Sequence, residues 1–312
     1  MFGRILGVIG KTLIVAGLLV LGFVGYQLWG TALSQSNAQA ELTRTLASES
    51  DVETTAGPVV IKQLAEELAS VNAATAPATA PPPEGDPVGV ITIAKIGLQR
   101  VIVEGVSKPD LKKGPGHYPG TPLPGQAGNS AIAGHRTTYG APFNRIDELV
   151  VGDEIQVATP QGEFTYVVIP APGQATQAWY TVSPAQVEVL ANMGDNRITL
   201  TACHPKYSAK QRIIVHGVLK TPPAAAAVVV APPSETATPA KASAQFDEGQ
   251  AGDSKALQTA LFFGAAAAAV ALLAWILGKF VRRWPIYVLA TPAILVLIWY
   301  AYVYTDRYMP SL

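Results

Sequence analysis

The sequence predicts an all-β domain of the barrel type, with short helices, joined to three membrane-spanning helices. Residues 87–220 hold many short runs rich in β-branched residues, separated by Gly, Pro, Asn and Asp turns. That pattern is typical of a closed or nearly closed barrel. Hydrophobic residues make up 49% of the chain, and its mean hydropathy of +0.27 is high for a wholly soluble protein. Uncharged apolar runs near both ends account for this value and predict the spans.

Seven runs predict the strands of the barrel, because each is short, carries β-branched residues and is bounded by turn residues. They are residues 88–97, 100–105, 130–134, 153–159, 164–169, 197–203 and 212–219. Connections long enough for a helix are few, and the sequence offers two, at residues 108–113 and 183–193. An open layered α/β fold would need more of them.

The first apolar run, residues 12–29, has no charged residue and follows the basic Arg4 and Lys11. Its length approaches the ~20 residues that cross a bilayer core. A cleaved signal peptide is the alternative, and residues 38–40 (Ala-Gln-Ala) resemble a cleavage site. The run is longer than the roughly 7–15 apolar residues of a signal peptide, and that site lies well beyond its end. An uncleaved anchor is therefore favoured.

Two further apolar runs, residues 256–278 and 286–304, predict a helical hairpin around a short basic loop, residues 279–284. The positive-inside rule places this loop and the amino terminus in the cytoplasm. Residues 31–255 and the last few residues then lie outside. A buried helix of a soluble protein over residues 260–274 is the alternative, but three runs with the expected flanking charges disfavour it.

These observations predict one compact extracytoplasmic domain held between two tethers rich in Ala, Thr and Pro, which have too few apolar residues to form a core. One short helix is expected in the first tether, because Ile61, Leu64 and Leu68 recur at helical spacing. The predicted segments are an anchor over 1–30, a spacer over 31–86, the barrel domain over 87–220, a spacer over 221–255, the hairpin over 256–305 and a tail over 306–312.

Charge and cysteine content narrow the function. The formal net charge is zero, so nothing is basic enough to indicate nucleic-acid binding. Cys203 is the single cysteine of the chain, which excludes an intrachain disulfide. An unpaired thiol outside the cytoplasm usually has a chemical reason.

Candidate catalytic residues lie where predicted strands end. In residues 197–203, Ile198, Leu200 and Ala202 alternate with polar residues, so Cys203 points to the face opposite the apolar one. Pro205 ends that strand, and the chain re-enters a strand at Arg212. If the two strands pair, the thiol and the guanidinium can face one groove.

His135 also follows a predicted strand and could join Cys203 and Arg212 in one catalytic site. Taken singly, each residue has an ordinary explanation: a small buried thiol, a capping histidine and a solvated arginine. Together they have a chemical logic. A thiolate attacks an acyl carbon, an imidazolium protonates the leaving amine, and a fixed cation stabilises the oxyanion.

The stretches GPGHYPGT (114–121), GHRTTYGAPF (134–143), VGD (151–153) and LTACHP (200–205), followed by Arg212, resemble the class E sortases of actinobacteria. The resemblance covers residues 87–219, with the motifs in order and at the expected spacing. The family usually has TLTTC before the nucleophile, and here Ala202 replaces the second threonine. Because alanine lacks a hydroxyl, this departure puts the hydrogen bonds beside the thiol in doubt, but it does not affect the assignment of Cys203 as the nucleophile.

The resemblance implies an eight-stranded sortase barrel that cleaves a C-terminal LAXTG- or LPXTG-type sorting signal between Thr and Gly. It implies His135 as the catalytic histidine, Cys203 as the residue that forms a thioacyl intermediate, and Arg212 as the residue that stabilises the oxyanion or holds the signal backbone. Tyr118 and Thr201 are implied as substrate-binding residues, with Tyr118 beside the second signal position. The remaining histidines, His117, His204 and His216, are expected to be structural.

The implied partners are surface proteins that carry the sorting signal, a cell-wall precursor amine and the membrane, with no metal or other cofactor. Two alternatives remain. A thiol acyl hydrolase or peptidase on the same barrel differs in whether an added amine captures the acyl group. A non-enzymatic anchored module would only present the barrel to partners, and the set of His135, Cys203 and Arg212 argues against it.

Overall fold

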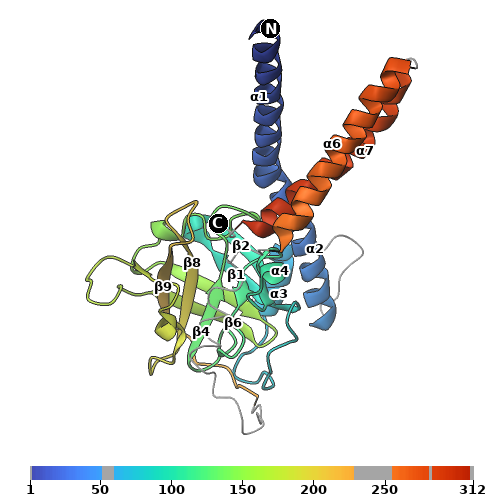
Figure 1. Cartoon of the computed structure of the whole chain (residues 1–312). Helices are drawn as coiled ribbons and strands as arrows, with labels where there is room; N and C mark the ends of the chain where they lie inside the picture. Colours follow the sequence, from blue (N-terminus) through green and yellow to red (C-terminus); the bar gives the residue numbers. More distant parts are fainter. Residues whose placement is uncertain (1, 51–59, 228–254, 281–282, 310–312) are drawn as a thin grey trace. The chain divides into compact units, whose positions relative to one another are not determined.

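The computed structural model describes residues 2–50, 60–227, 255–280 and 283–309 (Figure 1). The chain divides into two compact units. One comprises the N-terminal residues up to Gly30 together with the C-terminal apolar helices, and the other comprises residues 31–250. Each unit is described separately below.

The second unit is built on a closed barrel of eight strands. Nine strands form one sheet in the order β6-β5-β1-β2-β3-β4-β8-β9-β7, and β6 also pairs with β9, which closes the ring. The ninth strand, β7, pairs with β9 beside β6 and is not needed for closure. The strands are β1 (Pro87–Ile93), β2 (Leu98–Glu104), β3 (Gly116–His117), β4 (Asn129–Ala133), β5 (Glu154–Thr159), β6 (Gly162–Val168), β7 (Trp179–Val182), β8 (Arg197–His204) and β9 (Gln211–Leu219).

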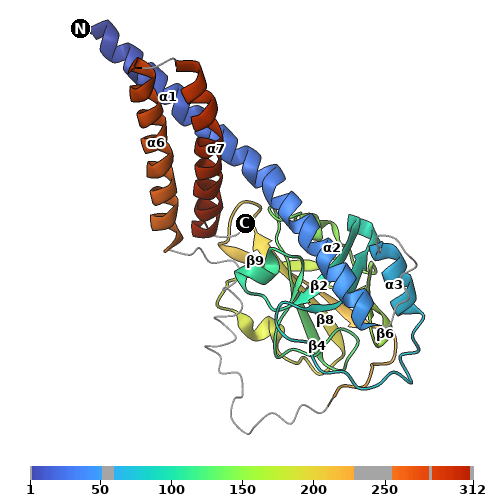
Figure 2. The same ribbon diagram turned by 90° about the vertical axis from the view of Figure 1, so that its right-hand side faces the viewer.

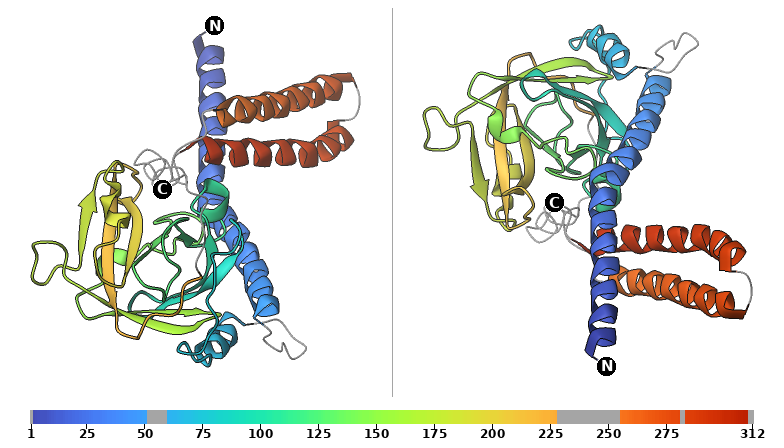
Figure 3. Two further views of the ribbon diagram at one scale, coloured as in Figure 1. Left: turned by 90° about the horizontal axis from the view of Figure 1, so that it is seen from below. Right: turned by 90° about the horizontal axis from the view of Figure 1, so that it is seen from above.

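The predicted barrel is confirmed, and all seven predicted runs form strands. Alternating side chains from the longer strands fill its interior, including Ile91, Val157, Phe164, Leu200 and Val215. Figure 3 shows the strands curving around this common interior. A buried interior of this kind is what period-two alternation in short strands predicts.

Two strands were missed in the sequence. The two-residue strand β3 is too short to show a period, yet it bridges β2, to which it runs parallel, and β4, to which it runs antiparallel. Strand β7 is the other. The two expected helical connections are short: α4 (Lys108–Leu111) and a single 3₁₀ turn, η4 (Val187–Leu190). Two more 3₁₀ turns, η2 (Ala94–Ile96) and η3 (Ile146–Glu148), lie in other connections.

The expectation of an extended spacer over residues 31–86 is wrong for much of that segment. It forms α2 (Thr31–Glu49) and α3 (Ile61–Ala69), and only the short helix α3 was anticipated. Both helices lie against the outside of the barrel (Figures 1 and 2). The physical reason is a second hydrophobic cluster, in which leucines at helical spacing cover outward-facing valines of the barrel. Its members include Leu42, Leu46, Leu64, Leu68, Val90, Val101 and Val103.

The segment that follows the last strand, residues 221–227, stays attached to the barrel unit. Ala224 and Ala226 form isolated bridges with Gln126 and Thr79, so residues 221–227 lie beside the segment that enters the barrel. The buried Gln161 side chain donates to the carbonyl oxygens of Pro77 and Ala225, at 2.9 Å and 2.7 Å. The start of the expected 221–255 spacer is therefore part of the barrel unit, and residues 228–254 lie outside the described residues.

The first unit contains the apolar helices. By length and composition, α6 (Ala256–Phe280) and α7 (Arg283–Tyr308) can each cross a membrane, which agrees with the predicted hairpin. The predicted total of three spans is not reached within the described residues. The N-terminal run forms α1 (Phe2–Gly25) and a π-turn, η1 (Tyr26–Gly30), and its apolar helical part, Leu13–Gly25, is shorter than the ~20 residues that cross a bilayer core.

Helices α1 and α7 are in contact within this unit. The Tyr302 hydroxyl donates to the Leu19 carbonyl oxygen at 2.7 Å, and Gln27 Nε2 donates to Asp306 Oδ1 at 3.1 Å. The rings of Tyr26 and Trp299 meet edge to face, with centroids 5.0 Å apart. Aromatic contacts and polar groups that satisfy each other are suited to holding apolar helices together in lipid.

Candidate active site

Cys203 and Arg212 face each other across two neighbouring strands. The antiparallel register of β8 and β9 pairs Cys203 directly with Arg212. Both side chains are almost completely buried. The guanidinium is fixed by its own loop, because Arg212 Nη1 donates to the carbonyl oxygens of Ala209 at 2.9 Å and Gln211 at 3.2 Å. The expected pairing of the two strands is thus confirmed.

His135 is brought level with Cys203 by a parallel pair of strands. Strand β4 runs parallel to β8 and pairs Ala133 with Thr201. The Gly134 amide then donates to the Thr201 carbonyl oxygen at 3.0 Å, so His135 and Cys203 each lie two residues beyond a paired position. The His135 carbonyl oxygen accepts from the Phe143 amide at 3.1 Å, which folds the following loop back. The structure therefore gathers the three predicted residues at one end of β4, β8 and β9.

Residues of β8 alternate between the two faces as expected. Ile198, Leu200 and Ala202 belong to the barrel interior. Thr201 points outward, where its Oγ1 lies 3.1 Å from the Tyr118 hydroxyl. Because Ala202 faces the interior, a threonine at this position would lie on the opposite face of the strand from the thiol. The departure from the family pattern therefore leaves the hydrogen bonds on the outer face unchanged.

Tyr118 is buried more deeply than a side chain on an open groove wall. Its exposed fraction is 2%. It belongs to an apolar cluster on the outer face of the barrel that includes Ala131, Ala133 and Ile214. The two expected substrate-binding residues, Tyr118 and Thr201, are thus both buried and contact each other.

Arg136 is a buried residue of this site that sequence reasoning missed. Its guanidinium pairs with Asp147, with Nη2 to Oδ2 at 2.8 Å. Nη1 lies 2.9 Å from His204 Nδ1 and donates to the Cys203 carbonyl oxygen at 3.4 Å. Burial and the Arg136 charge both lower the pKa of His204. Arg136 follows His135 directly, and this adjacency was the available signal.

Arg136 ties the histidine loop to the end of the nucleophile strand, so replacing it with glutamine is expected to impair both folding and activity. We expect the free energy of unfolding to fall by about 2 kcal/mol, because Asp147 and the Cys203 carbonyl lose a charged partner. Cleavage of a substrate peptide is expected to slow by about tenfold or more, because the strand end shifts. Chemical unfolding and initial rates on the full-length protein measure the two effects.

Arg145→Gln is the matched control. Arg145 lies in the same loop and makes an exposed ion pair with Glu148, with Nη2 to Oε2 at 2.6 Å. Exposed pairs contribute ~0–1 kcal/mol, so this variant is expected to match the parent protein. An Arg136→Gln protein that behaves like Arg145→Gln would show that Arg136 holds nothing in place.

The other three histidines are bound by protein groups. His117 Nδ1 lies 2.7 Å from Glu104 Oε2, and its Nε2 lies 2.9 Å from the Pro122 carbonyl oxygen. His216 lies between Thr199 and Tyr180, at 2.9 Å and 2.8 Å. Burial lowers the pKa of His216 to about 4, so its imidazole is neutral near pH 7. These contacts agree with structural roles for these histidines.

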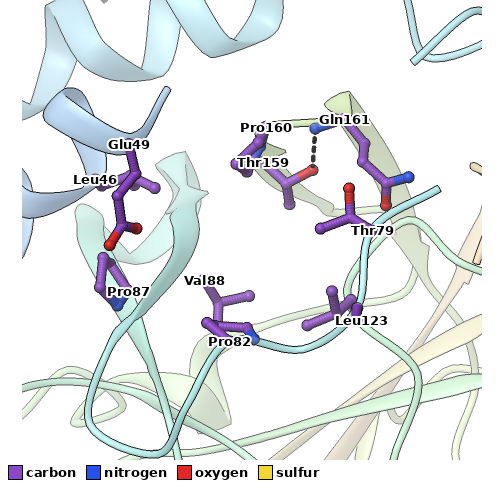
Figure 4. Close-up of a pocket in the computed structure, with 11 residues that line it drawn as sticks. Leu46, Glu49, Thr79, Pro82, Pro87, Val88, Leu123, Thr159, Pro160 and Gln161 are labelled. Atoms are coloured by element: carbon purple, nitrogen blue, oxygen red, sulfur yellow. Dashed lines mark hydrogen bonds between the residues drawn. The ribbon is translucent and has the colours of Figure 1, made fainter. Parts of the chain in front are cut away.

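A pocket of about 120 Å³ lies elsewhere on the barrel unit, between the C-terminal end of α2, the start of β1 and the turn between β5 and β6 (Figure 4). The Gln161 amide donates to Thr159 Oγ1 at 3.1 Å along its edge. The lining residues are Leu46, Glu49, Thr79, Ala80, Pro82, Pro87, Val88, Leu123, Thr159, Pro160 and Gln161. None of these is a cysteine or a histidine, so the pocket is not where thiol chemistry takes place.

Comparison with known proteins gives one family. The family model described as the sortase domain matches residues 91–220. Sortase SrtE1 of Streptomyces coelicolor is 33% identical over 226 residues, which cover 67% of this chain and 55% of that protein. Sortase D of Bacillus subtilis is 29% identical over 216 residues, which cover 67% of this chain and 96% of that protein.

The solved structure of sortase E from Streptomyces avermitilis shares 36% identity over 44% of this chain and 90% of that one, with a TM-score of 0.38. The chain spans about half the length of Streptomyces coelicolor SrtE1. The matched region contains every strand of the barrel after the first few residues of β1, and it includes Cys203, His135 and Arg212. Residues 91–220 of the chain therefore match the sortase domain, the domain of a family of cysteine transpeptidases, and the relatives of the chain include class E sortases.

Proposed function

We propose that this protein is a membrane-anchored transpeptidase that cleaves a C-terminal LAXTG- or LPXTG-type sorting signal between Thr and Gly. It then transfers the acyl group to an amine of a cell-wall precursor. The observation that carries the proposal is the register that pairs Cys203 with Arg212 while β4 brings His135 level with the thiol. Three groups with complementary roles in acyl transfer meet at one end of three adjacent strands.

In the proposed reaction, the Cys203 thiolate adds to the threonine carbonyl carbon. The Arg212 guanidinium stabilises the negative oxygen that forms, since two backbone carbonyls already fix its direction. The C–N bond to glycine then breaks, and the His135 imidazolium gives its proton to the departing amine. The incoming amine next attacks the thioester, His135 takes up its proton, a new amide bond forms and the thiolate leaves.

The membrane arrangement is part of the proposal. Helices α6 and α7 are each long and apolar enough to span a bilayer. Lys279 and Arg283 lie at the ends of these helices that join them. Positive residues favour the cytoplasmic side, so we propose that this connection is cytoplasmic and that the catalytic domain lies outside. A reporter fused at Arg283 that is active only outside the cell would reverse this orientation.

One experiment separates transfer from the alternatives. The full-length protein in detergent is incubated with a LAXTG-containing peptide, with and without a diglycine or diaminopimelate amine, and the products are read by mass. An amide between the peptide threonine and the added amine supports transpeptidation. Threonine acid alone, in spite of excess amine, would identify a hydrolase. An intact peptide under all conditions would favour a binding module.

The identity of the second signal residue provides a specificity prediction. We expect faster consumption of LAXTG than of LPXTG peptides, because we propose that Tyr118 lies beside the second signal residue, where its ring would leave room for a methyl group more readily than for a pyrrolidine ring. Contacts of this kind discriminate by roughly 1–3 kcal/mol, or about tenfold or more. Competing both peptides in one reaction measures the ratio, and we expect Tyr118→Ala to narrow it.

Tyr118→Phe separates the ring from the hydroxyl, which lies 3.1 Å from Thr201 Oγ1. If the ring alone sets the preference, the phenylalanine variant keeps the parent ratio. A ratio that falls in both variants assigns the preference to the Tyr118–Thr201 contact. Equal consumption of the two peptides by the parent protein would remove the preference itself.

A further inference from the structure

Helix α2 buries polar side chains along half of the face that it turns toward the barrel. Thr31, Gln35 and Gln39 follow one another at intervals of four residues, and each is less than a tenth exposed. Further along this face, Leu42 and Leu46 join the hydrophobic cluster between helix and barrel, with the buried Thr43 between them. Burying amide and hydroxyl groups costs free energy unless they form hydrogen bonds. The buried polar side chains of α2 therefore require hydrogen-bond partners on the barrel at the positions that they face.

Gln39 fixes the helix to the barrel backbone. Its Oε1 accepts from the Val101 amide at 2.8 Å, and its Nε2 donates to the carbonyl oxygens of Val101 and Lys113, both at 3.0 Å. A side chain at Gly114 would overlap Gln39 Nε2. The glycine that opens the GPGHYPGT motif is therefore required by the close approach of α2, in addition to any role in substrate binding.

The N-terminal end of α2 holds the loop that follows His135. Three successive residues of this loop have positive φ angles, which are 49° at Tyr139, 70° at Gly140 and 42° at Ala141. Such angles cost about 1–3 kcal/mol for each residue other than glycine and persist only where neighbours enforce them. Thr31 Oγ1 accepts from the Tyr139 amide at 3.4 Å, and a Cβ at Gly140 would lie 2.6 Å from Gln35 Oε1.

Tyr139 contacts both α2, through its backbone amide, and the candidate catalytic histidine, through its ring. Its side chain is buried, and its ring centroid lies 5.4 Å from that of His135. Lys112 Nζ also lies over the Tyr139 ring, 4.8 Å from its centroid. A buried ring held at both its backbone and its face restricts the orientations that the neighbouring imidazole can adopt.

We infer that Tyr139 is a positioning residue for His135 and that Thr31 and Gln35 of α2 lock it in place. The helix that precedes the barrel in sequence thus completes the catalytic centre, although none of its residues reaches the reacting atoms. This inference rests on the proposed function for its effect on turnover. Its structural half, the orientation of His135, is measurable without any substrate.

The test compares two identical substitutions on the same face of α2 in the full-length protein. Thr31→Val removes the acceptor for the Tyr139 amide while keeping the size of the side chain. Thr43→Val is the matched control, because the buried Thr43 hydroxyl donates only within the helix, to the Gln39 carbonyl oxygen at 2.7 Å. We expect Thr31→Val to lower kcat by about fivefold to tenfold with KM within about twofold, and Thr43→Val to leave both unchanged.

The second readout is the imidazole signal of His135 in protein labelled with ¹³C-histidine. The chain has four histidines, and His135→Gln identifies the relevant resonance. We expect Thr31→Val to shift or broaden this resonance alone and Thr43→Val to move none of the four. If either the kcat or the His135 resonance of Thr31→Val stays at the level of Thr43→Val, the inference is wrong.

Tyr139 itself provides the final comparison. Tyr139→Leu removes the aromatic ring and is expected to reproduce the Thr31→Val changes or exceed them, whereas Tyr139→Phe restores the ring and is expected to rescue kcat. A leucine variant that fails to fold leaves the decision to the threonine pair. If the parent protein turns over no peptide, the proposed function fails, and the His135 resonance alone decides whether α2 orients the histidine.

Discussion

Cys203→Ala and His135→Ala are each expected to abolish signal cleavage while leaving the barrel folded. In the proposed reaction, Cys203 supplies the sulfur that forms the thioester, and no other cysteine exists in the chain to replace it. In the same reaction, His135 supplies the proton without which the amine leaves poorly. Losing a nucleophile or its acid partner typically costs several orders of magnitude in rate. Cleavage of a LAXTG peptide by the purified full-length variants measures the loss.

Retention of fold is measured beside activity. Both side chains are almost fully buried near the ends of β4 and β8, so truncation is expected to lower the thermal unfolding temperature by several degrees while the barrel stays folded. A thiol-reactive probe adds an independent control, because only Cys203 can be labelled. Substantial turnover by a folded Cys203→Ala or His135→Ala protein would remove that residue from the mechanism.

Arg212→Lys is expected to lower the rate of cleavage by about 10² or more, the scale of losing one oxyanion donor. Lysine keeps the positive charge, but an ammonium on a flexible stem lacks the rigid fork of donors that a guanidinium presents. In this structure the Arg212 fork is aligned by carbonyl oxygens of Ala209 and Gln211. Lysine cannot reproduce that alignment while also facing the substrate.

Arg197→Lys is the matched control, because Arg197 begins the same strand that carries Cys203 near its other end. It pairs with Asp195 and lies far from the thiol along the β8–β9 ladder. We expect a rate close to that of the parent protein. A near-normal rate for Arg212→Lys as well would show that charge alone suffices at position 212.

Several parts of the fold and the site could be predicted from the sequence because their signals are local. Period-two alternation in residues 197–203 indicated both the strand and the face of Cys203, and the structure has that strand as β8. The stretches around Tyr118, His135 and Cys203 indicated the family, since each motif is contiguous. Long apolar runs indicated α6 and α7 for the same reason.

Other features depend on residues far apart in the chain, and only the tertiary structure decided them. The composition of residues 31–49 resembles a spacer, because threonine and glutamine carry no hydrophobic signal. They are buried in α2 only because the amide of Val101 and the loop at Tyr139 lie opposite them. No local sequence pattern indicated the role of Arg136, because its partners Asp147 and His204 are distant in sequence and only the fold brings them together.

The sequence by itself indicated seven of the nine strands of the sheet, the candidate catalytic residues and the two C-terminal helices that are apolar enough for a membrane. Those properties follow from each segment's own side chains. The tertiary structure decided that the ring closes through β6 and β9, that Tyr118 lies buried against Thr201, and that α2 reaches the histidine loop. Each of these depends on which distant backbone groups meet, because a buried polar group is stable only where a partner satisfies its hydrogen bonds.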